Sequence, residues 1–242
     1  TLEELFLLGK LAREFASGNV DFRLRDVDFG TDGKLKGAPW LGMKIAEIDG
    51  LDRVLVVGST LRKDHPLIAN RLRQATKRVT QLSLINPIDN DLLMRVAHKA
   101  IVSPAAMPAM LAQVLKATAQ AMNVEISAGI RGALQGVVIS EVAQRIADSL
   151  VSGKNAAVFL GNLAEHHPQA AQLHALAQDL ANVTGARFGF LGEAANSVGG
   201  YLAGAVPFSA EPTGMNAAQM LAQPRQAYLL LGVEAELDTH NP

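Results

Sequence analysis

Apolar and polar residues along the chain follow two different periods, one typical of strands and one typical of helices. Short, mainly apolar segments bounded by glycine, proline or polar residues predict strands. Longer segments in which apolar residues recur every three or four positions predict helices. The predicted strands are 20–22, 53–57, 79–85, 156–160, 187–190 and 227–231, and the alternation over 92–102 fits either a strand or a loop. The predicted helices are 1–18, 43–48, 66–75, 103–122, 140–151, 168–183 and 215–221.

The alternation of strands and helices from residue 53 onward predicts an α/β fold. We expect two lobes, each a mainly parallel sheet flanked by helices. Residues 1–100 form the first α/β lobe in this interpretation. Residues 101–242 form a linking helix and a second α/β lobe that is truncated at its C-terminal end.

Three of the predicted strands are followed by the same sequence of features. Each ends in a glycine, continues into a short polar loop and reaches a proline where a helix is expected to begin. These segments run from Val54–Gly58 to Pro66, from Ala157–Gly161 to Pro168 and from Tyr228–Gly232 to Pro242. Glycine allows a tight turn and a close approach of the backbone, and a helix start offers free N–H groups to an anion.

Ligands of open α/β sheets bind at the carboxyl edge, where these turns lie. The candidate cofactor-binding residues, which we interpret as a vestigial site, are Gly58, Ser59, Thr60, Arg62, Gly161 and Gly232. The same features also occur at ordinary βα turns of a packed sheet, so a purely structural role remains the alternative.

Composition and charge exclude several classes of function. The 242 residues hold 22 Lys+Arg and 23 Asp+Glu, for a net charge of −1, which argues against a nucleic-acid partner. There is no cysteine, so thiolate metal sites and iron–sulfur clusters cannot form within this sequence. No apolar run approaches the ~20 residues of a membrane span, so we expect no direct membrane insertion.

The sequence also lacks the common catalytic fingerprints. No dinucleotide-binding glycine motif, phosphate loop or serine elbow follows a predicted strand. His167 and His174 are seven residues apart on one predicted helix, but no third metal ligand is evident. We therefore predict no catalytic residue and no metal site.

The order of four short segments resembles the molybdopterin oxidoreductase family. An acidic helix start at Thr1-Leu-Glu-Glu4 leads through a helix to Asn19-Val-Asp21, where the family typically has Asn-Asn-Ile-Asp. The stretch from Val56 to Pro66 resembles the family's Gly-Ser-Asn-Pro turn, which touches the pterin nucleotide. Two further blocks match at 161–185 and 231–234. The resemblance implies the fold of the first domains of formate dehydrogenase and DMSO reductase.

The sequence departs from the family pattern at the position of the metal ligand and at the turn that touches the pterin nucleotide. In relatives of the formate dehydrogenase type, a Cys or selenocysteine that binds molybdenum soon follows the Asn-Ile-Asp segment. The matching position here falls at or near Val27, which has no donor atom. Asp26 and Asp28 stand beside Arg23 and Arg25, which indicates a salt-bridged surface. Because Thr60 and Leu61 also replace the Asn and Pro of the turn, the resemblance argues against a bound molybdopterin.

Within this family, the chain resembles the branch found in the large iron–sulfur subunit of NADH-quinone oxidoreductase (respiratory complex I). That branch implies a non-catalytic scaffold in a complex that transfers electrons from NADH to quinone. It also implies iron–sulfur clusters in an N-terminal part outside this sequence, other peripheral-arm subunits of complex I as partners, and a cytoplasmic place at the inner side of a bacterial membrane. Two alternatives stay open: a catalytic molybdopterin enzyme of the formate dehydrogenase type, and a free-standing nucleotide-binding α/β protein.

Overall fold

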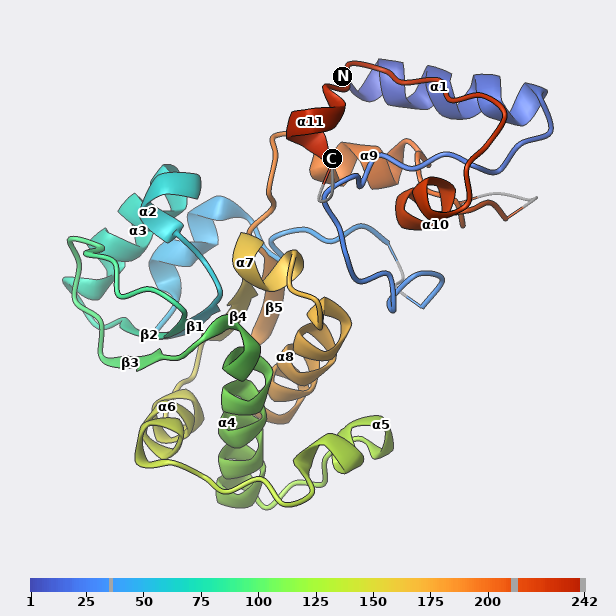
Figure 1. The fold of residues 1–242 in the computed structure, drawn as a ribbon. Helices are drawn as coiled ribbons and strands as arrows, with labels where there is room; N and C mark the ends of the chain where they lie inside the picture. The colour runs from blue at the N-terminus through green and yellow to red at the C-terminus, as the bar shows by residue number, and fades with distance from the viewer. Residues whose placement is uncertain (35–36, 210–212, 240–242) are drawn as a thin grey trace. The chain divides into compact units, whose positions relative to one another are not determined.

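The centre of the fold is a parallel sheet with the strand order β3-β2-β1-β4-β5 (Figure 1). The computed structural model describes residues 1–34, 37–209 and 213–239. Within them the strands are β1 (Arg53–Val57), β2 (Gln81–Asn86), β3 (His98–Ile101), β4 (Ala156–Leu160) and β5 (Arg187–Phe190). All four neighbouring pairs run parallel, with Val54 of β1 opposite Leu82 of β2 and Ala157 of β4.

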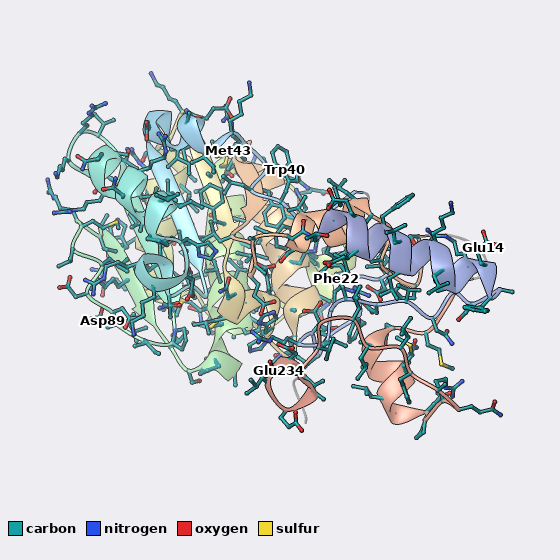
Figure 2. All side chains as sticks on the ribbon, turned by 90° about the horizontal axis from the view of Figure 1, so that it is seen from above. Glu14, Phe22, Trp40, Met43, Asp89 and Glu234 are labelled. Atoms are coloured by element: carbon teal, nitrogen blue, oxygen red, sulfur yellow. The ribbon has the colours of Figure 1, made fainter. Side chains whose placement is uncertain are left out.

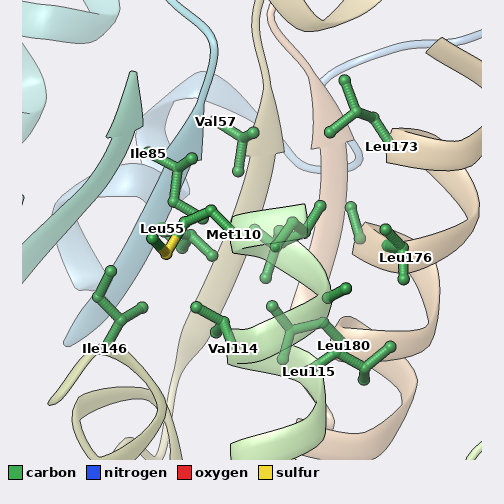
Figure 3. Close-up of a cluster of buried hydrophobic side chains, with 14 of the residues drawn as sticks. Leu55, Val57, Ile85, Met110, Val114, Leu115, Ile146, Leu173, Leu176 and Leu180 are labelled. Atoms are coloured by element: carbon green, nitrogen blue, oxygen red, sulfur yellow. The ribbon is translucent and has the colours of Figure 1, made fainter. Parts of the chain in front are cut away.

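Helices cover both faces of this sheet, as its apolar strands require. Leu55 and Val57 of β1 point to a face covered by α4 (Met107–Met122), α6 (Glu141–Val151) and α8 (Ala170–Thr184). Figure 3 shows Val114 and Leu115 of α4 beneath these strands, with Ile146 of α6 and Leu180 of α8 on either side. Val54 and Val56 point to the opposite face, against η1 (Ile45–Gly50) and α3 (Pro66–Thr76). The predicted α/β class is confirmed.

Short helical segments make up the connections of this part of the chain. They are α2 (Leu61–Asp64), η2 (Pro104–Ala106), α5 (Ala128–Arg131), η3 (Gly132–Leu134) and α7 (Asn162–Glu165). Pro66 begins α3, as its missing N–H favours, and the Ser140 side chain caps α6 by accepting a hydrogen bond from the Ala143 amide.

The chain divides into two compact units. The sheet unit is Trp40–Glu193, and a second unit, here called the split unit, joins Thr1–Pro39 with Ala194–Pro242. The split unit holds α1 (Leu2–Glu14), α9 (Ser197–Leu202), α10 (Ala217–Ala222) and α11 (Ala235–Asp238). Thr1 and Glu4 form a reciprocal capping box at the start of α1, and Figure 2 labels Glu14 at its end.

The two parts of the split unit meet closely at Gly214. A side chain on Gly214 would overlap the Gly18 carbonyl, so only glycine allows these two backbone segments to touch. Nearby, the Asn19 side chain accepts a hydrogen bond from the Met215 amide at 2.8 Å. Residues almost two hundred positions apart thus hold one unit together.

Two predicted strands are wrong. Residues 20–22 have no strand, and 227–231 form none although Tyr228–Leu231 are all apolar. Leu229 and Leu230 are 67% and 59% exposed. The segment belongs to the split unit, where the described residues offer it no strand as a neighbour. The helix start predicted at Pro242 lies outside the described residues.

The predicted division at residue 100 differs from the division that the structure shows. One sheet takes β1, β2 and β3 from before that residue and β4 and β5 from after it. The reason is that β4 pairs directly with β1, so the two predicted sheets are halves of a single one.

Candidate functional site

The carboxyl ends of β1 and β4 lie side by side at the middle of the sheet. The chain leaves β1 toward β2 and β3, and it returns to the other side of β1 to form β4 and β5. This reversal is the topological switch point at which open α/β sheets bind their ligands. Gly58 and Ser59 follow β1 and Gly161 follows β4, so the structure brings these three predicted site residues together.

Gly58 and Gly161 are packed against protein atoms. Gly58 has a φ of +64°, and a Cβ there would lie 2.7 Å from the Ala164 amide nitrogen. A Cβ on Gly161 would lie 2.5 Å from the Ser59 Cβ and 2.7 Å from the Gly58 carbonyl oxygen. The two turns are further joined by a hydrogen bond from the Leu163 amide to the Gly58 carbonyl at 2.9 Å. Both glycines therefore serve the mutual packing of the turns.

Three polar atoms at this edge are buried without a protein hydrogen-bond partner. They are Ser59 Oγ, His65 Nδ1 and Asn162 Oδ1. His65 Nε2 donates to the Gly192 carbonyl at 2.9 Å, because that oxygen can only accept, and Nδ1 is the ring nitrogen left without a protein partner. A buried polar atom without a partner costs about 1–3 kcal/mol, so these atoms favour a polar ligand or bound water at the edge.

The remaining predicted residues have other surroundings. The Thr60 hydroxyl donates to the Asp64 carboxylate, one turn along α2. Arg62 is exposed on α2. Gly232 lies in the split unit with open space around it and no strand before it. Thr60 and Arg62 flank the paired turns, whereas Gly232 belongs to a different unit from the other five.

The sequence patterns did not indicate Asn162 or His65 Nδ1 as part of the site. A signal existed for Asn162, because a polar residue directly after a strand-end glycine lies at the carboxyl edge. For His65 the sequence shows only a position before Pro66, which says nothing of where its ring points. His167, considered as a metal ligand, uses both ring nitrogens for protein contacts, with Gln169 N at 2.9 Å and Pro104 O at 3.0 Å.

The segment that resembles the family's metal-binding region does not supply ligands. Val27 is exposed and has no donor atom. Arg23 forms ion pairs with Asp21 at 2.8 Å and with Asp32 at 2.6 Å, so these carboxylates are bound to a cation of the protein itself. Within the described ranges no group of three or more His, Asp or Glu side chains is placed to hold a metal ion. The residues present do not fit a molybdenum ion, although the polar atoms at the carboxyl edge would suit the nucleotide part of such a cofactor.

None of the helices in the described part of the chain combines the length and the apolar character that crossing a bilayer requires.

Comparisons with known proteins give a family and a set of similar solved structures. A chain of the formyltransferase/hydrolase complex from Methylorubrum extorquens, solved in complex with methylofuran, matches with 19% identity and a TM-score of 0.41. The match covers 63% of this chain and 39% of that one, so this chain spans well under half the length of its structural neighbour. The curated proteins give no match. The model of the family described as molybdopterin oxidoreductase matches residues 1–241, and the chain therefore belongs to the molybdopterin oxidoreductase family.

Proposed function

We propose that the chain is a non-catalytic scaffold domain of the large iron–sulfur subunit of NADH-quinone oxidoreductase. The proposal is supported by the resemblance, which places the family's metal ligand at or near Val27, and by the ion pairs that Arg23 of the same segment forms with both Asp21 and Asp32. A domain of this redox family without a metal ligand keeps its architecture but has no group with which to transfer electrons.

The proposal also assigns the surroundings of the domain. The chain itself carries no cofactor, in keeping with the absence of cysteine from its sequence. Iron–sulfur clusters in another part of the large subunit pass electrons from NADH toward quinone. The partners are other peripheral-arm subunits, and the complex is attached to the inner side of a bacterial membrane.

A second candidate is a catalytic molybdopterin enzyme of the formate dehydrogenase type. The polar atoms at the carboxyl edge favour it, because Ser59 Oγ and Asn162 Oδ1 are buried acceptors that a pterin nucleotide could satisfy. This candidate requires a metal ligand from outside the protein or from a residue other than Val27.

Metal content and activity of the complete protein from its native cells distinguish the two candidates. We expect it to copurify with NADH:quinone reductase activity and to contain far less than one molybdenum per chain, with no pterin after acid oxidation. Val27→Ala in the chromosomal copy should leave the reductase activity unchanged, because the side chain has no chemical role. One molybdenum per chain together with formate oxidation would contradict the scaffold role. Absence of both metal and reductase activity would leave a scaffold but exclude complex I as its assembly.

A further inference from the structure

The split unit is organised around charges where a domain normally has an apolar core. Both clusters of buried apolar side chains lie in the sheet unit. Among the described residues of the split unit, the buried apolar side chains are small ones: Val20, Ala203, Ala205, Val206 and Ala217. The Arg23 and Asp21 side chains, by contrast, are 5% and 0% exposed. Its most deeply buried large side chain is therefore a cation.

Arg23 is held by two carboxylates. Its Nε and Nη2 donate to the two oxygens of Asp21 at 2.8 Å each, and Nη1 and Nη2 donate to Asp32 at 2.6 and 3.0 Å. Burial opposes the charged guanidinium, but the bonds to Asp32 and Asp21 outweigh burial and raise the pKa of Arg23. Two bidentate contacts of this kind use the planar fork that only arginine has.

Aromatic rings surround the same guanidinium. Its central carbon lies 4.9 Å from the ring centre of Phe29, 5.5 Å from that of Phe208 and 5.8 Å from that of Tyr201. A cation over an aromatic ring face is stabilised by the ring's charge distribution, most strongly where water is excluded. Burial raises the pKa of Tyr201 to about 12, even though the charge of Arg23 acts in the opposite direction.

The cluster also joins the two distant parts of the split unit. Asp21 Oδ2 accepts a hydrogen bond from the Ala217 amide at the start of α10, at 3.0 Å. Phe29 comes from the N-terminal part of the unit, whereas Tyr201 and Phe208 come from the C-terminal part. One side chain thus contacts both halves of a unit whose described residues form no apolar cluster of their own.

We infer that the Arg23 cluster, made of Arg23, Asp21, Asp32 and the rings of Phe29, Tyr201 and Phe208, is the organising centre of the split unit. The inference deepens the proposed function, because it explains how the segment that has lost a metal ligand keeps a fixed conformation. Arg23 acts by holding the N-terminal and C-terminal parts of the split unit in place. The cluster predicts that the split unit folds without any cofactor and depends on the guanidinium.

Ionisation of Tyr201 tests the inference in the 242-residue chain. Tyr201 and Tyr228 are the two tyrosines, so a Tyr228→Phe background leaves Tyr201 as the group that absorbs at 295 nm when it ionises. We expect Arg23→Met to open the cluster and to lower the pKa of Tyr201 from about 12 toward the ordinary ~10. If the cluster stays closed in Arg23→Met, the pKa of Tyr201 should rise instead, because Tyr201 stays buried and the positive charge that lowers its pKa is gone. That result would overturn the inference.

Arg25→Met is the matched control. Arg25 lies in the same segment, two residues along, with half of its side chain exposed and an ion pair to Asp238 at 3.4 Å. It should leave the pKa of Tyr201 unchanged, whereas Arg23→Lys should give an intermediate fall because lysine lacks the fork.

Limited proteolysis keeps the inference testable if Arg23→Met unfolds part of the chain. We expect cleavage to become about a hundredfold faster within 1–39 and 194–242 while 40–193 stays intact, as the loss of a buried charge partner implies. Cleavage equal to that of Arg25→Met would overturn the inference. Cleavage spread equally through the sheet unit would also overturn it, because the centre would then not belong to the split unit. Neither readout depends on metal content or reductase activity, so a failure here leaves the proposed function to its own test.

Discussion

The most informative single residue of the sheet unit for stability is His174 on α8. The centre of its ring lies 5.3 Å from the ring centre of Phe188 of β5, in a stacked arrangement. It lies 5.0 Å from the ring centre of Phe190, in a T-shaped arrangement. Burial lowers the pKa of His174. The histidine therefore acts as a third aromatic side chain over the end of the sheet, and it does so in its neutral form.

The lowered pKa of His174 predicts a dependence of stability on pH. As the pH falls, His174 takes up a proton first in the unfolded chain, near the ordinary pKa of ~6.5. The free energy of unfolding therefore keeps its highest value above that pH and decreases below it. His174→Phe should keep the ring packing and reduce the loss of stability between pH 7.5 and 5.5, measured from urea midpoints. His98→Gln is the comparison: burial, and then Arg145, also lower the pKa of the partly buried His98, which stacks on neither ring. An unchanged slope in His174→Phe would show that other groups govern the acid sensitivity.

At the scale of elements, the edge of β5 is covered by residues 40–42. The Phe190 amide donates to the Trp40 carbonyl at 2.8 Å. A side chain on Gly189 would overlap the Leu41 carbonyl, and one on Gly42 would overlap the Phe188 carbonyl. Two glycines thus let the backbones touch and protect an edge that would otherwise be open to pairing with another chain.

Gly189→Ala should separate these backbones. Overpacking of this kind costs about 1–3 kcal/mol, and more where backbone cannot move aside. We expect a lower free energy of unfolding by at least that amount, together with faster amide exchange at Phe190. Gly192→Ala, three residues on, has nothing within 4 Å of the added methyl group and should be close to neutral. Equal effects of the two substitutions would mean that residues 40–42 do not protect the edge of β5.

Local pattern predicted the elements well where the residues are buried in the sheet. The predicted strands at 53–57 and 156–160 coincide with β1 and β4, because an apolar run there reports burial on both faces. The predicted strand at 187–190 coincides with β5, which is an edge strand and is only partly buried. The run at Tyr228–Leu231 has the same composition, but a strand requires a neighbour, and sequence alone cannot say whether one is present. The alternation over 92–102 fitted a strand or a loop because β3 is a short edge strand with one open side.

At the scale of the whole molecule, sequence predicted the glycine turns at the ends of β1 and β4, but it did not predict that they meet or which segments form a unit. Gly58, Ser59 and Gly161 come together because parallel strands place their carboxyl ends at one edge. The split unit combines two distant stretches, and its hydrogen bond from Ala217 to Asp21 links residues 196 positions apart. Periodicity is a local property, so it carries no information on such pairing. The Arg23 cluster was for the same reason predicted only as a surface of salt bridges.

The two units differ in what holds them together, and this difference predicts how the chain can be divided. Both apolar clusters lie wholly within Trp40–Glu193, and the Trp40 carbonyl already bonds to Phe190 near the other end of that segment. The excised segment 40–193 should therefore fold alone, with one cooperative urea transition followed by the fluorescence of Trp40, the chain's single tryptophan. A shorter segment, 40–151, lacks β4, β5 and α8, so β1 loses its pairing with β4 and the apolar cluster loses the side chains of α8. It should show no such transition. If 40–193 also melts without cooperativity, the split unit supplies part of its stability and the two units fold together.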